Sequence, residues 1–450
     1  MKKHTSPILL GLLVALMPAE AFAQLIGSDS PPPASVRRPY RGLFGNSDDP
    51  NTPQSLVLSA SLYGAHDDNV SAGLSGRETF DPRLQRSGEY YGATTALAYS
   101  LAKNVGRASF GVNSGVGASG YYYDERRSVV PHGQVSASAS LPLGRRNTVH
   151  LNQQVAYTRY YRFLLFPSPL GGDDDGALAG DPDVELFARP AVRYGTSVGF
   201  SHSFGSRSSL SFTYNHHYVD YLEDEFAGWR SQGAGIHYDR RLTAHATLNL
   251  GYGYNVGSSI DGERRDREVH NLNVGLNYSR ALSISRRTSI SFSTGSAILV
   301  RDDLNLPGTD PRANFRLLGN AQLTHELGRT WTAQAAYHRG LMFREGFDDP
   351  FLTDGVTAAV GGFVTRRLDL SVVGRWSLAT LDRAGRNGHD SMAASAQARF
   401  ALAQFVALFA RYVYYEYEFD ADVPLDSGLP RSLDRRGVRV GITASLPLIR

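Results

Sequence analysis

Strict alternation of apolar and polar residues over long stretches is the feature that most constrains how this chain folds. In residues 245–257, six apolar or aromatic side chains from Ala246 to Val256 alternate with His, Thr, Asn and Gly. Residues 207–219 and 289–300 repeat the pattern. A period of two places successive side chains on opposite faces of a β-strand. The sequence therefore predicts strands with one apolar and one polar face.

Two properties of these stretches distinguish a membrane barrel from a soluble β-sandwich, whose strands also alternate. The stretches run for about 12 to 14 residues, whereas soluble strands usually have about five or six. Their polar positions carry Gly, Ser, Thr and Asn rather than Lys and Glu. Small polar residues suit a water-filled lumen, and the opposite apolar face suits contact with lipid.

The connections between the expected strands alternate between tight turns and longer segments. The tight turns are 103–106, 143–147, 204–207, 240–243, 284–287, 327–329 and 366–369, and the longer segments include 67–87, 166–190, 258–267, 301–312 and 420–435. Short turns at one end and long loops at the other are typical of outer-membrane barrels. We therefore predict an all-β fold, a transmembrane antiparallel β-barrel of about 18 strands (range about 16 to 18), with both termini on the periplasmic side.

The N-terminal residues predict export from the cytoplasm. Lys2 and Lys3 precede an apolar stretch over 8–17, and Ala21-Phe22-Ala23 supplies a small-x-small cleavage pattern. The apolar stretch is too short for a membrane-spanning helix, which needs about 20 residues. The expected organisation is a cleavable signal peptide (1–23), a disordered Pro-rich periplasmic leader (24–53) and the outer-membrane barrel (54–450) of a Gram-negative bacterium.

Tyrosines concentrate where the expected strands approach the long loops. They are Tyr121, Tyr122, Tyr123, Tyr157, Tyr160, Tyr161, Tyr218, Tyr221, Tyr252, Tyr254, Tyr412, Tyr414, Tyr415 and Tyr417. Rings with a polar tip favour the headgroup boundary of a membrane, so the pattern predicts an external aromatic girdle. The alternative is that they are sheet-core tyrosines at strand ends, because Tyr suits any strand.

Arginines at polar strand positions are the candidates for solute selectivity in a barrel wide enough for an aqueous channel. By alternation they are Arg162, Arg316, Arg375, Arg399 and Arg439. Projecting into one constriction, they would favour anions or an acidic polysaccharide. The alternative is that they pair with lumen acids such as Asp239, Asp369 and Glu416 and brace the barrel.

No metal site is predicted. Asp173, Asp174 and Asp175 are the weak candidates, because carboxylates on a loop are suitable ligands for calcium or another divalent ion. Their spacing does not match a helix–loop–helix calcium site, and acidic external loops are common. His216 and His217 are neighbours on a strand and point to opposite faces, so they cannot chelate one ion.

Catalysis and nucleic-acid binding are not expected, and no cofactor is implied. The Gly-x-Ser-x-Gly match around Ser197 lies inside an alternating strand. A nucleophilic serine in this motif requires a strand–turn–helix elbow instead. The formal net charge of +3 is small, and the arginines are scattered rather than gathered in a patch that would bind nucleic acid.

From about Leu56 to its end, the chain resembles the β-barrel porin type 2 group of proteobacterial outer-membrane proteins. The resemblance lies in the long alternating strands and in arginine-bearing tight turns such as 143–146 and 327–331. Several members of that group lie in exopolysaccharide gene clusters, so the resemblance implies polysaccharide export. The terminal residue Arg450 departs from the aromatic residue with which many outer-membrane barrels end.

We therefore expect an outer-membrane channel that passes an extracellular polysaccharide or another polar solute. The first alternative is a general or substrate-specific diffusion porin for small solutes, and the second is a closed structural or adhesive surface barrel. The expected partners are outer-membrane lipid, lipopolysaccharide, the barrel assembly machinery and a periplasmic polysaccharide-export partner.

Overall fold

The structure is a computed structural model. It describes residues 54–68, 87–105, 107–123, 126–161, 165–166, 187–222, 228–260, 267–281, 287–299, 314–343, 347, 350–381, 386–421, 423, 425 and 431–449. The predicted signal peptide and leader lie outside these residues, and so do Arg162, Asp173, Asp174 and Asp175. Within the described ranges, no helix has the length and apolar character needed to cross a membrane.

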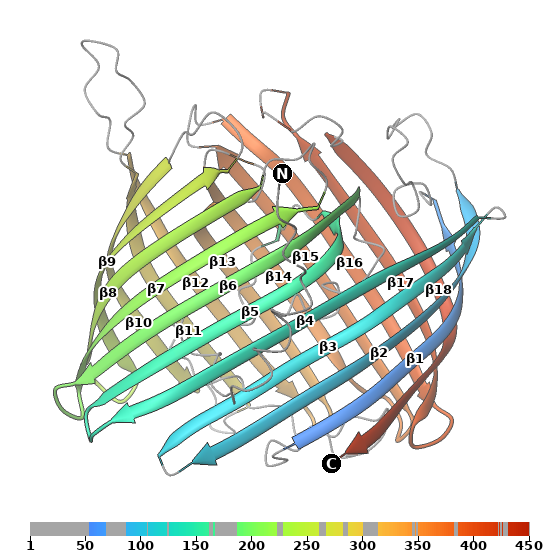
Figure 1. Cartoon of the computed structure of the whole chain (residues 1–450), viewed down its shortest axis with the longest axis horizontal. Helices are drawn as coiled ribbons and strands as arrows, with labels where there is room; N and C mark the ends of the chain where they lie inside the picture. Colours follow the sequence, from blue (N-terminus) through green and yellow to red (C-terminus); the bar gives the residue numbers. More distant parts are fainter. Residues whose placement is uncertain are drawn as a thin grey trace, which may run out of the picture.

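The described chain forms one closed barrel of 18 antiparallel strands (Figure 1). The strands are β1 (Gln54–Asp67), β2 (Gly88–Val105), β3 (Ala108–Tyr123), β4 (Arg126–Leu143), β5 (Asn147–Tyr161), β6 (Phe187–Ser203), β7 (Ser208–Tyr221), β8 (Trp229–Arg241), β9 (Ala246–Ser259), β10 (Arg267–Ala281), β11 (Thr288–Leu299), β12 (Asn314–Leu327), β13 (Trp331–Met342), β14 (Phe351–Phe363), β15 (Leu368–Leu381), β16 (Arg386–Ala401), β17 (Val406–Phe419) and β18 (Ser432–Ile449). They slant across the wall in Figure 1, as closure of a sheet into a barrel requires.

Each strand pairs with its neighbours in sequence, and β1 pairs with β18 to close the sheet. Leu56 lies opposite Ile449, so the first strand begins and the last strand ends at the same end of the barrel. This closure leaves no unpaired edge, which is the condition for a sheet to lie in lipid. The predicted fold class and strand number are confirmed.

The tight turns lie together at the end of the barrel where β1 begins. Gly144 and Gly328 follow β4 and β12 and have φ angles of 82° and 73°, a left-handed conformation that favours glycine. The Leu-Gly-Arg sequences of these turns are therefore explained by backbone geometry. The opposite end carries the longer connections, although the one from β3 to β4 spans only residues 124–125.

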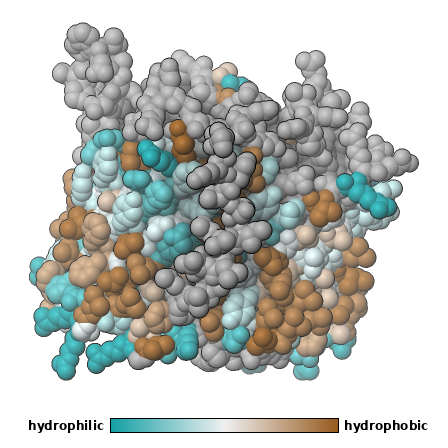
Figure 2. All heavy atoms as spheres, viewed as in Figure 1, coloured by the Kyte–Doolittle hydropathy of each residue, from teal (hydrophilic) through white to brown (hydrophobic). Residues whose placement is uncertain are grey.

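The outer face of the wall is apolar, as the alternation predicts. Its exposed large side chains include Leu62, Leu97, Val116, Leu151, Phe200, Phe212, Ile236, Leu250, Leu272, Val274, Leu317, Val356, Val372, Trp376, Leu408, Val440 and Ile442. Figure 2 shows apolar residues grouped over the outside of the wall, with hydrophilic residues along its lower edge. Because these side chains are apolar and unburied, the outer face is suited to the hydrocarbon core of a bilayer.

An apolar cluster lies inside the barrel, next to the end with the long connections. Tyr415 and Tyr417 of β17 are 4% and 1% exposed and pack there with Leu165, Phe347 and Val423. The last three residues belong to connections between strands, so parts of these connections turn inward and pack on the inner wall of β14–β18. The sequence did not predict this cluster.

The predicted aromatic girdle is correct for only some of its members. The exposed outer-face tyrosines include Tyr122, Tyr252 and Tyr412, whereas Tyr221, Tyr415 and Tyr417 pack in or against the inner cluster. The interpretation was wrong for these three because tyrosines an odd number of residues apart were assigned to one face. Such residues face opposite sides of a strand.

Candidate functional site

Arginines gather on the inner wall of β15–β18. The inward positions are those that alternate with exposed outer residues such as Val372 and Leu408. Five arginines occupy them, namely Arg375 of β15, Arg399 of β16, Arg411 of β17 and Arg435 and Arg439 of β18. The inner positions of β15–β18 and β1 carry only two carboxylates within the described residues, Asp67 and Asp369. This wall therefore has an excess of positive charge.

Strand register places four of these arginines in two rows across the wall. Arg411 lies directly opposite Arg439 across the pairing of β17 with β18. Arg375, Ala393, Tyr415 and Arg435 form a second row across four strands. Like charges directly opposite on one face of a sheet are unfavourable for folding.

Each of the two inward carboxylates on this wall forms an ion pair with an arginine. Asp369 is buried and pairs with Arg399 directly opposite it. Asp67 accepts from Arg435 at 2.7 Å (Nη2) and 2.8 Å (Nε), and both residues are buried. These pairs correspond to the bracing role that the sequence offered as an alternative. Arginines on the wall still outnumber carboxylates.

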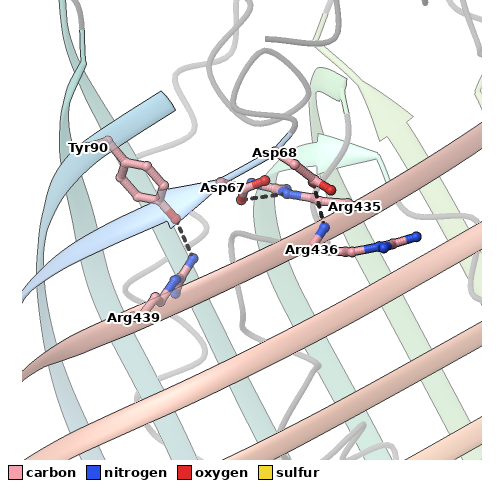
Figure 3. A network of polar contacts seen from close by, with 6 residues as sticks. All are labelled: Asp67, Asp68, Tyr90, Arg435, Arg436 and Arg439. Carbon is pink, nitrogen blue, oxygen red and sulfur yellow. Dashed lines mark hydrogen bonds and ion pairs between the residues drawn. The ribbon is translucent and has the colours of Figure 1, made fainter. Parts of the chain in front are cut away.

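Arg439 is held at the seam, the pairing of β1 with β18 (Figure 3). Its Nη2 donates to the hydroxyl of Tyr90 at 2.9 Å, and its guanidinium carbon lies 4.8 Å from the centre of the Tyr63 ring. That distance permits a cation–π interaction. Arg439 is only 6% exposed, so it is a component of the seam as well as of the inner wall.

The seam also depends on small residues beside Tyr63. Tyr63 lies opposite Gly92 of β2 on one side and Gly441 of β18 on the other. A Cβ atom at position 92 would overlap the Tyr63 ring, so only glycine allows the ring to cover this position. Tyr63 also contacts Tyr90 and Phe409, with ring centroids 6.4 Å and 6.3 Å away.

The structure separates one of the predicted arginines from the others. Arg316 of β12 alternates with the exposed residues Phe315 and Leu317, so it is on the inner face but three strands away from β15. Sequence reasoning missed Arg411 and Arg435. Arg435 shares the odd-numbered parity of Arg439, and this signal was available in the sequence.

The lumen acids proposed from the sequence include one error. Glu416 has the even-numbered parity of the exposed residues Leu408 and Tyr412, so it lies on the outer face. There its side chain accepts a hydrogen bond from Tyr414. Asp239 alternates with the exposed residue Ile236 and lies on the inner face, as expected.

The opposite wall, β5–β11, is lined mostly by small neutral residues. Ser197 donates to the amide oxygen of Asn215 at 2.6 Å, so the Gly-x-Ser-x-Gly match belongs to the inner wall of a strand. His217 also lines the lumen, whereas His216 has the outward parity. No group of three or more His, Asp or Glu residues that would hold a metal ion occurs in the described part of the chain.

Comparisons with known proteins give structural likeness only. No family model matches the chain, and no curated protein matches it. Among solved structures, Pseudomonas aeruginosa OccK2 (OpdF) in complex with glucuronate is similar with a TM-score of 0.45 and 10% identity, covering 88% of this chain and 98% of that one. P. aeruginosa OpdO is similar with a TM-score of 0.44 and 14% identity, covering 88% of this chain and 98% of that one. Acinetobacter baumannii OccAB3 is similar with a TM-score of 0.41 and 10% identity, covering 88% of this chain and 99% of that one.

The geometry itself defines the class of protein. A closed 18-stranded barrel with an apolar outer face and a polar inner face is a transmembrane β-barrel. Its candidate functional site is the inner wall, with an arginine-rich side over β15–β18 and a side over β5–β11 lined mostly by neutral residues.

Proposed function

We propose that this protein is an outer-membrane channel through which small polar solutes diffuse passively, anions more readily than cations. The observation that carries the proposal is the excess of inward arginines over carboxylates on β15–β18 and β1. A charged wall in a low-dielectric surrounding attracts solutes of opposite sign and repels those of the same sign. The location implies outer-membrane lipid and lipopolysaccharide as its surroundings and assembly by the barrel machinery.

The arginine arrangement supports function more than folding. Arg411 lies directly opposite Arg439, and like charges in this position are by themselves unfavourable for a sheet, so folding alone gives no reason for the arrangement. The two ion pairs reduce the charge of the wall without cancelling it.

The inner cluster favours small solutes over a polymer. Leu165 and Phe347 enter the barrel from its connections and pack on the wall of β14–β17, which narrows the passage. Export of an extracellular polysaccharide stays a prediction from the family resemblance, and we propose the diffusion channel in its place.

Reversal potential in a planar bilayer with a KCl gradient tests this function. We expect a stable open conductance that prefers chloride. Arg375→Gln removes a positive charge from the wall, and Arg399→Gln also leaves the Asp369 carboxylate without this partner. Each variant lowers the charge of the wall by one, so both should shift the preference towards potassium.

Arg436→Gln is the matched control, because Arg436 carries the same charge on the outer face of β18, where it pairs with Asp434. It should leave the reversal potential unchanged. A channel that prefers cations, or one that responds equally to all three substitutions, would refute the role of the inner arginines. A folded barrel without conductance would favour a closed structural barrel.

A further inference from the structure

A cavity of about 340 Å³ lies on the neutral side of the lumen, away from the arginine-rich wall. Its polar lining comes from strands β5, β6, β7, β8, β9 and β10. The side chains that matter for the argument are Asn152, Gln154, Ser197, Asn215, Asn255 and Asn271. The described lining contains no Asp, Glu, Lys or Arg. His217 of β7 is the one titratable side chain in the described lining, so a ligand of this cavity meets mainly uncharged hydrogen-bonding groups.

Two aromatic rings, Trp229 of β8 and Phe343, also line the cavity. Phe343 follows β13 and turns into the lumen, where its Cδ1 would lie 3.2 Å from a Cβ atom placed on Gly257 of β9. The ring thus reaches a wall four strands away in the sheet. The cavity is enclosed on this side by an aromatic surface that only the folded barrel creates.

Two amide groups in the cavity have an unused hydrogen-bonding atom. The Oδ1 atoms of Asn152 and Asn271 are shielded from solvent and accept no hydrogen bond from the described residues. Leaving a buried acceptor unsatisfied costs about 1–3 kcal/mol, so such groups usually have a partner. By contrast, Ser197 and Asn215 already bond each other at 2.6 Å and form a stable edge of the cavity.

We propose that this cavity binds an uncharged, polyhydroxylated solute of monosaccharide size. The hydroxyl groups around a sugar ring project in several directions, and amide and hydroxyl groups from six strands surround the space in which they would lie. Asn152 and Asn271 line this space and present their side-chain amide groups to two of these hydroxyls, and Trp229 or Phe343 covers the apolar C–H face of the ring. A nucleobase has its polar atoms on its edges only, and a carboxylate ligand would have no Lys or Arg in the described lining. This inference rests on the proposed channel function and names a solute class that the channel passes.

Tryptophan fluorescence gives a binding readout that does not depend on conductance. The chain has three tryptophans, so a Trp331→Phe/Trp376→Phe background leaves Trp229 as the single emitter. Titration of the folded barrel in detergent with D-glucose should change its emission in a saturable way, whereas glycerol at equal concentration should not.

Alanine substitutions then test the two amide groups. Asn152→Ala and Asn271→Ala should each raise the half-saturating glucose concentration about fivefold, the equivalent of one ordinary hydrogen bond. Asn249→Ala is the matched control, because Asn249 of β9 also has a shielded, unsatisfied Oδ1 but does not line this cavity. An equal effect of all three substitutions would overturn the assignment to this cavity.

The same titration in a planar bilayer separates the two proposals. A chloride-preferring conductance that glucose partly blocks supports both. If the conductance is present but glucose alters neither emission nor current, the sugar site is refuted and the channel remains. If glucose binds but the membrane stays silent, the channel is refuted. A response to uridine without a response to glucose would also overturn the sugar assignment, in favour of a nucleoside.

Discussion

Replacing Asp67 with asparagine tests whether the seam between β1 and β18 depends on a buried ion pair. Asp67 and Arg435 are 1% and 4% exposed, and one carboxylate oxygen accepts from both Nε and Nη2 of the guanidinium. The residues are 368 positions apart, so the pair forms only when the barrel closes. Asparagine preserves the volume of the side chain and removes its charge.

The expected loss is large because the pair is buried. Removing one member of a buried ion pair costs about 3–5 kcal/mol, since the remaining charge stays in a poorly solvated place. At the lower limit of about 3 kcal/mol, the equilibrium between closed and unfolded barrel shifts about 150-fold. The double variant Asp67→Asn/Arg435→Gln removes both charges and should recover part of this loss, which is the sign of a direct interaction.

Urea unfolding in detergent micelles measures this effect, with folded and unfolded barrels distinguished by their mobility in an unheated gel. Asp434→Asn is the control, because Asp434 pairs with Arg436 on the outer face, where the two side chains are 44% and 56% exposed, and should leave the midpoint unchanged. A midpoint for Asp67→Asn equal to that of the parent would refute the reasoning. The reasoning would also be refuted if the double variant lost more unfolding free energy than the two single variants lose together.

Two further predictions concern close packing inside the barrel. Gly92→Ala should destabilise the barrel by about 1–3 kcal/mol in the same urea assay, because the new Cβ overlaps the Tyr63 ring. Adding Tyr63→Ala to the Gly92→Ala variant should relieve the overlap. Gly374→Ala should have little effect, because a Cβ atom at position 374 would meet open space. Equal losses of stability at both glycines would contradict this explanation. Leu165→Asp places a carboxylate in the inner apolar cluster, where the leucine contributes about 1.5–3 kcal/mol of burial. It should release this segment from the wall and raise the single-channel conductance, and an unchanged conductance would show that the segment does not narrow the passage.

The alternation of side chains carried most of the fold prediction. Leu250, Tyr252 and Phe212 are exposed on the outer face, and Gly257 lies inside, as their positions in the pattern required. The tight turns at Gly144 and Gly328 were also visible in the sequence, because left-handed glycines between alternating stretches mark hairpins. The strand number followed from counting these hairpins, and the structure has 18.

Local pattern failed where parity was ignored. Tyr415 and Tyr417 were grouped with Tyr412 and Tyr414 because they are close in sequence, and Glu416 was assigned to the lumen. In a strand of strict period two, the odd members of this run face inward and the even members face outward. Applying the parity of Arg439 to the whole of β18 would have added Arg435 to the candidate arginines.

The sequence by itself determined the class of fold, the two faces of each strand and the ends at which the turns and long connections lie, because these depend on periods of two residues and on turn chemistry. Only the tertiary structure decided which inward residues meet. Asp67 reaches Arg435, Arg439 covers Tyr63, and Phe343 reaches the wall of β9, through register and closure of strands far apart in sequence. A one-residue change of register would alter each of these contacts without altering the alternation, so no local pattern contains them.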